Sequence, residues 1–90
     1  MSQFRNHERA RRYELEIGGG VSFANYRDED GVRAITHVET PPALRGRGYA
    51  AELMGAIVED ARGQGRALRP ICPYAAAYFK RHPEAGDVLA

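Results

Sequence analysis

Two arginines and two glycines alternate in Arg45-Gly46-Arg47-Gly48, between a strand-like stretch and a helical one. Glycine has no Cβ, so an anionic ligand could approach the main chain closely at both glycines. The guanidinium groups add charge and planar hydrogen-bond donors. A helix that begins after Gly48 would add free N–H groups and a positive dipole end. The segment therefore predicts a diphosphate-binding turn held mainly by backbone.

The same segment allows a plainer interpretation, in which the glycines only shape a tight turn between a strand and a helix. The flanking arginines and the amphipathic stretch that follows favour phosphate binding. The segment is not a P-loop, because that motif requires Gly-x-x-x-x-Gly-Lys-Ser/Thr. It also departs from the dinucleotide fingerprint Gly-x-Gly-x-x-Gly, since Ala51 stands at the last position.

Three strands should lead into this segment. Residues 12–17 alternate apolar and polar side chains, which is the period-two pattern of a half-buried strand. After a run of three glycines, residues 21–26 indicate a second strand, antiparallel to the first. Residues 32–38 are rich in β-branched side chains and predict a third strand, which Pro41 and Pro42 would end.

An amphipathic helix should follow Gly48. Its apolar residues recur at spacings of three and four and form one stripe, made of Ala50, Leu53, Met54, Ile57, Val58 and Ala61. Gly63 and Gly65 would close the helix, because glycine readily takes the left-handed conformation of a helix end.

The last third of the chain predicts a short strand over residues 67–72 and a helix over residues 74–81. Pro70 favours an edge or bulge position, Pro73 can start the helix, and Pro83 would end it. The element order is then strand, strand, strand, helix, strand, helix. It predicts an α+β (α/β) fold with a mixed, mainly antiparallel sheet, in which the long helix returns a strand parallel to the third.

Length and charge narrow the classes of protein. Ninety residues form one domain, here 1–90, with residues 1–11 expected to be loosely ordered. The net charge of +1 argues against a general nucleic-acid binder. No apolar run is long enough to span a membrane and the N-terminus lacks a secretory stretch, so a cytoplasmic protein is expected. The single cysteine excludes an internal disulfide, and no Cys/His spacing predicts a metal site.

The pattern Arg45-x-x-Gly48-x-Ala50 resembles the acetyl-CoA signature of the GNAT (general N-acetyltransferase) superfamily, Gln/Arg-x-x-Gly-x-Gly/Ala. Further blocks resemble a subfamily of small, single-domain GNAT-like proteins and extend the resemblance over nearly the whole chain; they are residues 12–15, 36–41 and 72–84. The family usually has His-Thr-Glu-Val before the proline, whereas this chain has His37-Val38-Glu39-Thr40.

The resemblance implies a compact GNAT-like fold and acetyl-CoA as the cofactor. It implies that the main chain of the third strand holds the pantetheine arm and that the glycine turn holds the diphosphate. The implied cofactor-binding residues are Val38, Thr40, Arg45, Gly46, Arg47, Gly48, Tyr49, Ala50 and Tyr74.

Cys72 is the sharpest catalytic candidate under this resemblance. It is predicted at a strand end just before a helix, and a helix N-terminus favours the thiolate form of a cysteine. A thiolate could accept an acetyl group covalently before passing it on. Free cysteines also commonly pack in the core, and the sequence leaves the two roles level.

Tyr78 falls where related GNAT enzymes often carry a tyrosine that protonates the departing CoA thiolate. It could equally be a half-buried aromatic of the helix. Glu39 and His37 share one strand face and could act as a general base, although a solvated strand face explains both. Lys80 and Arg81 could meet the CoA phosphates but fit a solvated helix face better, and His82 should end the helix.

The first hypothesis is an acetyl-CoA-dependent N-acetyltransferase that modifies a small amine or an exposed lysine of a protein or peptide. The alternative is a non-catalytic acyl-CoA-binding or sensing module, which would keep residues 45–50 and need no reactive thiol. A third and weaker hypothesis is a partner-binding domain whose glycine turn binds nothing. The expected partners are acetyl-CoA and an unknown amine acceptor, and the chain could be a monomer or a weak dimer through its sheet edges.

Overall fold

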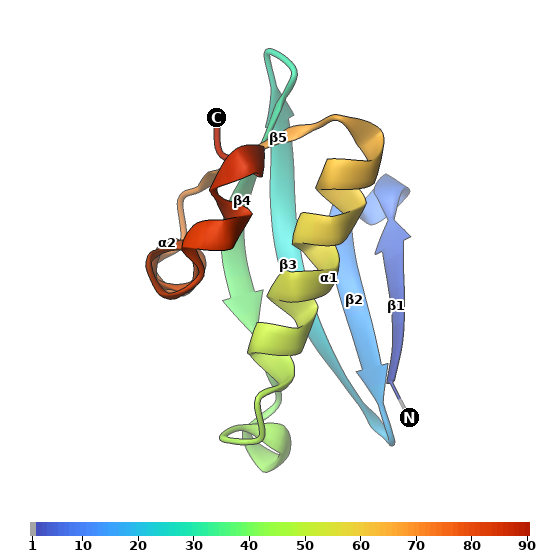
Figure 1. The fold of residues 1–90 in the computed structure, drawn as a ribbon. Coiled ribbons are helices and arrows are strands. Elements are labelled where there is room, and N and C mark those ends of the chain that lie inside the picture. Colours follow the sequence, from blue (N-terminus) through green and yellow to red (C-terminus); the bar gives the residue numbers. More distant parts are fainter. Residues whose placement is uncertain (1) are drawn as a thin grey trace.

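A computed structural model describes residues 2–90. It contains a five-stranded sheet in the order β1-β2-β3-β4-β5, with antiparallel pairs except for the parallel pair β4–β5 (Figure 1). The meander and the crossover that returns a parallel strand are therefore confirmed. The strands are β1 (Ser2–His7), β2 (Arg12–Ile17), β3 (Gly20–Glu29), β4 (Val32–Glu39) and β5 (Ala67–Pro70).

The N-terminal segment differs from its prediction as a loosely ordered stretch. Residues 2–7 form β1, which pairs with β2 along its whole length, and a short 3-10 turn, η1 (Glu8–Ala10), follows. The Phe4 ring stacks on Tyr13 with centroids 5.6 Å apart, and Asn6 accepts a 2.7 Å hydrogen bond from the Tyr26 hydroxyl. An edge strand needs few apolar residues, so the polar composition of residues 2–7 did not indicate a strand.

Two helices pack against the sheet. Helix α1 (Tyr49–Gln64) lies across β2 and β3, and α2 (Pro73–Arg81) contacts β4, β5 and α1 (Figure 1). The predicted stops hold, because α1 ends at Gly65 in the left-handed conformation and α2 ends just before Pro83. Pro70 was predicted to lie in an edge strand. It lies in β5, the last strand of the sheet, where it is paired with Ile35 of β4.

The residues that follow α2 are also ordered into regular structure and contribute to the core. A 3-10 segment, η3 (Pro83–Val88), follows and buries Ala85 and Val88. Beyond it, Leu89 forms a parallel bridge with Leu68 and the Ala90 N–H donates to the Leu68 carbonyl at 2.8 Å. The tail therefore extends the sheet for a short distance outside β5.

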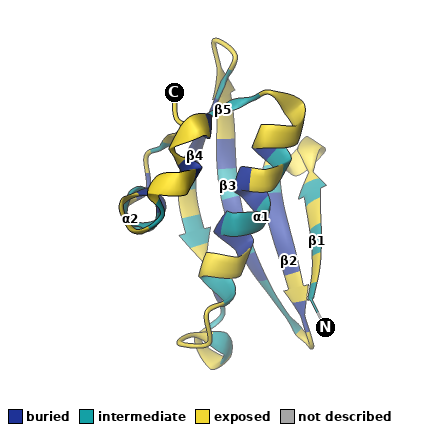
Figure 2. Ribbon diagram, in the orientation of Figure 1, coloured by how far each residue is buried: buried dark blue, intermediate teal, exposed yellow. Residues whose placement is uncertain are grey.

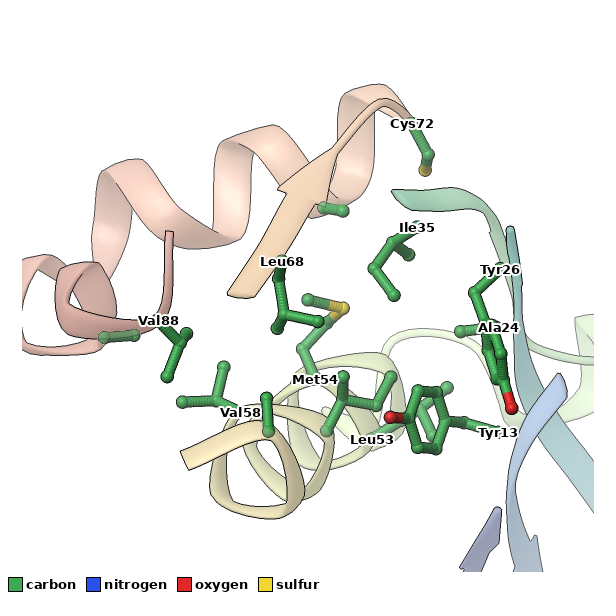
Figure 3. Close-up of a cluster of buried hydrophobic side chains, with 14 of the residues drawn as sticks. Tyr13, Ala24, Tyr26, Ile35, Leu53, Met54, Val58, Leu68, Cys72 and Val88 are labelled. Carbon is green, nitrogen blue, oxygen red and sulfur yellow. The ribbon is translucent and has the colours of Figure 1, made fainter. Parts of the chain in front are cut away.

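The core lies between the sheet and the two helices. The predicted stripe of α1 is buried at five of its positions, namely Leu53, Met54, Ile57, Val58 and Ala61. Figure 3 shows Leu68 and Ile35 of the sheet pointing toward this helix. The buried colour of Figure 2 follows the inward face of α1 and the middle of β2 to β4. The outward sheet face carries polar side chains such as Arg5, Glu16 and Glu39, all in exposed positions.

A buried arginine ties together three strands and α1. Arg33 is 2 % exposed, donates two hydrogen bonds to the Asp28 carboxylate at 2.7 and 2.9 Å, and donates a third to the Tyr13 hydroxyl at 2.8 Å. Tyr13 in turn donates to Asp60 of α1 at 3.0 Å. The Arg33 guanidinium also lies 3.9 Å from the centroid of the Tyr26 ring.

Burial and charge act in opposite directions on this network. Burial alone would lower the pKa of Arg33, but the hydrogen bonds to Asp28 and Tyr13 raise it above its ordinary value. Burial raises the pKa of Tyr13 to about 12, against the opposing effect of Arg33. The hydrogen bond from Arg33 lowers the pKa of Asp28. Arg33 therefore stays charged and Tyr13 stays neutral at any physiological pH.

Within residues 2–90, no helix has the length and apolar character needed to cross a membrane.

Candidate functional site

The strands β4 and β5 separate part of the way along the sheet. β5 pairs with Val32–Ile35 and then ends, and the Ile35 carbonyl accepts hydrogen bonds from the N–H groups of Ile71 and Cys72, both at 3.0 Å. β4 continues to Glu39 beyond this point. Its register against β3 shifts between Asn25 and Tyr26, where a β-bulge bends the strand. The two strands thus diverge from Ile35 onward.

Beyond Ile35, the main chain of β4 is no longer paired with β5 on that side. The Glu39 carbonyl accepts a 3.2 Å hydrogen bond from Ser22 and so faces β3. Because main-chain groups alternate sides along a strand, the N–H and C=O of Val38 face the side vacated by β5. The Val38 side chain packs against the core.

A groove of about 240 Å³ lies between the end of β4, the loop that contains η2 (Pro42–Leu44), the start of α1 and the first turn of α2. Its lining comprises Thr40, Leu44, Arg45, Gly46, Gly48, Tyr49, Ala50, Ala51 and Tyr74. The structure therefore brings together every predicted cofactor residue except Val38, whose side chain lies in the core, and Arg47, which is exposed outside the lining.

The glycines of the groove are required by backbone conformation. Gly46 and Gly48 have φ of 79° and 81°, which L side chains rarely adopt. Apart from the adjacent residues of the chain, a Cβ built on either glycine meets no atom of residues 2–90 within 4 Å, so the space beside them is open. Gly48 is the N-cap of α1, and its carbonyl accepts the Glu52 N–H at 3.0 Å. The N–H groups of the first helical turn therefore point toward the groove and suit an anion such as a diphosphate.

A chain of three hydrogen-bonded residues joins the loop to the sheet. Arg45 donates from Nε to the Thr40 carbonyl at 2.9 Å, and the Thr40 and Ser22 hydroxyls share a 2.8 Å hydrogen bond. Ser22 is fully buried and Thr40 is 9 % exposed. The guanidinium of Arg45 is thus fixed at the groove by its own loop. The role of Ser22 could not be predicted from the sequence, because a serine within a strand carries no signal until its partner Thr40 is known.

The chain also approaches itself closely where the loop crosses the β2–β3 hairpin. A Cβ built on Gly20 would lie 2.6 Å from Cδ1 of Leu44, which lines the groove. The absence of a side chain at Gly20 therefore leaves room for Leu44 and places the η2 segment against the sheet.

Cys72 is the N-cap of α2, just before the helix as the sequence predicts, but β5 ends at Pro70 rather than at Cys72. Its N–H donates to the Ile35 carbonyl, at the point where β4 and β5 diverge. Its side chain belongs to the core and the residue is 7 % exposed. Figure 3 shows it beyond Ile35 at one end of the buried cluster. This burial fits a packing role, while the position at the divergence of the strands fits a role in catalysis.

Tyr78 and Tyr74 lie one turn apart on the face of α2 that is turned toward α1. A Cβ built on Gly55 of α1 would lie 3.5 Å from the Tyr78 hydroxyl, so the two helices approach closely at this point. Burial raises the pKa of both tyrosines, and for Tyr78 the nearby charge of Glu84 raises it further. The Tyr78 phenol therefore keeps its proton at neutral pH. A glycine inside an amphipathic helix was the sequence signal for this approach.

Glu39 and His37 lie on the outward face of the sheet. The His37 Nε2 is 3.0 Å from the Glu39 carboxylate, and both side chains are about half exposed. Val38, between them, points the other way, into the core. The structure therefore separates the predicted base Glu39 from Cys72 and Tyr78, which lie on the helix-covered side.

A family model described as GCN5-related N-acetyl-transferase matches residues 12–88. The chain belongs to this family. Its fold is similar to the NMR solution structure of a GCN5-like protein from Staphylococcus aureus, with a TM-score of 0.76 and 20 % sequence identity over 98 % of this chain and 87 % of the other. No match was found among curated proteins. The family supports N-acetyl transfer as the general activity of this GNAT protein.

The described residues also bear on metal binding. Among residues 2–90, no group of three or more His, Cys, Asp or Glu side chains is placed to hold a metal ion.

Proposed function

We propose that this GNAT protein is an N-acetyltransferase that takes its acetyl group from acetyl-CoA. The observation that carries the proposal is the groove in which the left-handed Gly46 and Gly48, the first turn of α1 and the fixed guanidinium of Arg45 meet. Open space beside two glycines, free helix N–H groups and a cation together suit a diphosphate. The family supports the same cofactor class.

Different residues of the site would bind different parts of the cofactor. The N–H groups that open α1 would bind the diphosphate, with Arg45 beside them and Arg47 toward the nucleotide. The main-chain groups of Val38 would bind the pantetheine amides, as a strand would, on the side vacated by β5. Tyr74 and Thr40 would line the groove around this arm. The bound cofactor supplies a thioester carbonyl for attack by an amine.

The acceptor nitrogen must lose a proton and the departing sulfur must gain one. Tyr78 is proposed as the donor to the sulfur, because its phenol is protonated at neutral pH and its hydroxyl lies against Gly55 of α1, one turn of α2 from the groove residue Tyr74. Glu39, or His37 through its contact with Glu39, is proposed to take the amine proton at the outward face of the sheet. The two proton-transfer groups would then act from opposite faces of the opening between β4 and β5.

Cys72 offers a covalent route. The Cys72 thiol would first give up its proton to solvent, and its sulfur would then attack the thioester carbonyl; the C–S bond of the donor would break, and Tyr78 would protonate the released thiolate. The amine would then attack the acetyl-cysteine and regenerate the thiol. The position of Cys72 at the start of α2, where the strands diverge, supports this route.

The acceptor is proposed to be a small amine or an exposed lysine of a protein or peptide. The outward face of the sheet around Glu39 is open and carries exposed polar side chains. An open surface of this kind suits an acceptor that brings its own binding surface, as a protein would.

The deciding experiment titrates acetyl-CoA into the wild type, Gly48→Ala and Gly31→Ala by calorimetry. Gly31 is the matched control, because its φ of 80° equals that of Gly48 within a degree and it lies in the β3–β4 turn. We expect Gly48→Ala to weaken binding by at least about tenfold, equivalent to about 1.4 kcal/mol, and Gly31→Ala to leave it unchanged. Equal affinity of all three proteins, or no binding to the wild type, would contradict the proposal.

A second candidate function is a non-catalytic acyl-CoA-binding or sensing module. The burial of Cys72 and the separation of Glu39 from Tyr78 favour it. In that case the wild type would bind acetyl-CoA in the same titration, but acetylation of polyamine, peptide and protein amines would stay at the uncatalysed rate.

A further inference from the structure

The end of α2 holds three side chains that the proposed chemistry has used only in part: Tyr78, His82 and Glu84. The His82 ring stacks on the Tyr78 ring with centroids 4.1 Å apart and an interplanar angle of 25°. Its Nδ1 lies 3.1 Å from the Glu84 carboxylate, across Pro83. The residues i and i+4 of a helix are neighbours, so this stack follows from the helical spacing of Tyr78 and His82.

The stack requires the chain to leave α2 in one particular way. His82 is the C-cap of the helix, and its N–H donates to the Tyr78 carbonyl at 3.0 Å. Pro83 then opens η3, which places Glu84 within reach of the imidazole. A carboxylate that accepts from Nδ1–H fixes both the tautomer and the orientation of a histidine. The backbone and Glu84 together therefore set the plane of the His82 ring.

The Tyr78 ring is bounded on three sides. His82 covers one face, Phe79 meets the ring edge-on at 5.8 Å and 89°, and Gly55 of α1 leaves room for the hydroxyl. A phenol has few internal rotations, so these three contacts select one orientation of its hydroxyl. With the His82 face removed, the ring would be free to swing toward solvent.

The stabilising effect of such an exposed stack on the fold should be small, because the His82 and Glu84 side chains are 38 % and 72 % exposed. Its effect on geometry should be larger. A displacement of about 1 Å at a reacting group can cost roughly a hundredfold in rate. The contact is therefore better suited to aim a side chain than to hold the fold together.

We propose that His82, oriented by Glu84, is a positioning residue that fixes the Tyr78 ring and directs its hydroxyl toward Gly55 of α1. The inference rests on the proposed function, in which that hydroxyl gives a proton to the departing thiolate. The sequence predicted only that His82 ends the helix, a role that the backbone alone fulfils.

The test compares His82→Asn with His82→Phe in the full chain. Phenylalanine keeps a flat ring over Tyr78 but cannot bind Glu84, whereas asparagine keeps a polar donor and removes the ring. We expect His82→Asn to lower kcat by about tenfold while KM for acetyl-CoA stays within about twofold. His82→Phe should keep more of kcat than His82→Asn but less than the wild type, because its ring covers Tyr78 without being oriented by Glu84. In a Tyr78→Phe background, His82→Asn should cost nothing further, because the group that it positions is gone.

A second readout does not depend on activity. The aromatic resonances of Tyr78 should carry the ring-current shift of a stacked imidazole, lose it in His82→Asn and keep a ring-current shift in His82→Phe. His7→Asn is the control for the substitution, since His7 is an exposed residue of β1. It should change neither kcat nor the Tyr78 resonances.

Two results would overturn the inference: unchanged Tyr78 resonances in His82→Asn, or the same loss of kcat with and without the Tyr78 hydroxyl. Failure of the proposed function looks different. In that case the wild type acetylates no amine, yet the resonances still report whether His82 holds the Tyr78 ring.

Discussion

The protonation state of the Tyr78 phenol determines whether it can act as the proposed general acid. Burial raises its pKa above the ordinary value of about 10, and the charge of Glu84 adds to the effect. A general acid must be protonated to act, so activity that depends on Tyr78 should persist through neutral pH. It should fall only as the pH rises through this raised value.

The corresponding prediction concerns Tyr78→Phe. We expect kcat to fall by about a hundredfold, KM for acetyl-CoA to stay nearly constant, and the alkaline decline of the wild-type pH–rate profile to disappear. Steady-state kinetics between neutral pH and the onset of unfolding would check this. A variant that keeps full kcat would remove Tyr78 from the mechanism.

Cys72 calls for a test of covalent transfer. If the acetyl group passes through its sulfur, intact-protein mass spectrometry of wild type quenched with acid should show an acetyl adduct, and Cys72→Ser should not form it. We expect kcat of Cys72→Ser to drop by at least about tenfold with unchanged acetyl-CoA affinity. Full activity of Cys72→Ala would instead assign the residue to packing, in keeping with its 7 % exposure.

At the scale of elements, the groove depends on how its loop rests on the β2–β3 hairpin. Gly20→Ala would place a Cβ 2.6 Å from Cδ1 of Leu44. Because that methyl is the far end of a flexible side chain, we expect a stability cost of only about 1 kcal/mol, accompanied by a displaced loop and severalfold weaker acetyl-CoA binding.

Gly63→Ala is the matched control for this prediction. Gly63 lies within α1, and outside the adjacent backbone of that helix a Cβ at Gly63 meets no atom of residues 2–90 within 4 Å. The double variant Gly20→Ala/Leu44→Ala should recover affinity, since it removes the crowded methyl. If Gly20→Ala binds acetyl-CoA as the wild type does, the hairpin has no part in shaping the groove.

The elements around the site could be predicted from local patterns because their signals are local. Alternation gave β2, glycines and prolines marked both ends of α1 and α2, and the family pattern pointed to the loop at Gly46 and Gly48. What escaped prediction depends on partners distant in sequence. β1 has few apolar residues and becomes a strand by pairing with β2. The burial of Arg33 depends on Asp28 and on Tyr13, 20 residues away.

The proposed catalytic residues also divide into positions that could be predicted from local spacing and contacts that could not. The sequence could place Tyr74 and Tyr78 on one helix face and Cys72 at a strand end, because these positions follow from spacing. It could not show that Glu39 faces away from Cys72 and Tyr78, since that depends on which sheet face the helices cover. Nor could it show the His82 stack, which depends on how the chain leaves α2.

For the whole molecule, the network around Arg33 should make the free energy of unfolding decrease at acid pH. Arg33 holds the pKa of Asp28 below its ordinary value in the folded state. A depressed carboxyl pKa stabilises the fold at pH above the unfolded value, and this contribution is lost as the pH falls through the folded value. The loss should therefore appear only in the acid range, below about pH 4.

We expect Asp28→Asn to lower the free energy of unfolding at neutral pH by about 1 kcal/mol, since it leaves a buried guanidinium with a weaker partner while solvent screens the Asp28 carboxylate, which is 43 % exposed. Its stability should also fall less steeply in acid than that of the wild type. Urea denaturation at several pH values would measure both effects. Glu29→Gln is the control, because the Arg27–Glu29 pair is exposed on both sides and should change stability little. Parallel acid profiles for Asp28→Asn and the wild type would refute the assignment.

The short bridge between Leu89 and Leu68 has a consequence for self-association. Together with the hydrogen bond from Ala90, it occupies the outer rim of β5 that another chain would otherwise use for strand addition. At the other rim, β1 presents exposed Gln3, Arg5 and His7, whose charge and polarity disfavour stacking into fibrils. The two edges of this small sheet are thus protected differently: the C-terminal tail covers the β5 edge, and polar and charged side chains protect the β1 edge.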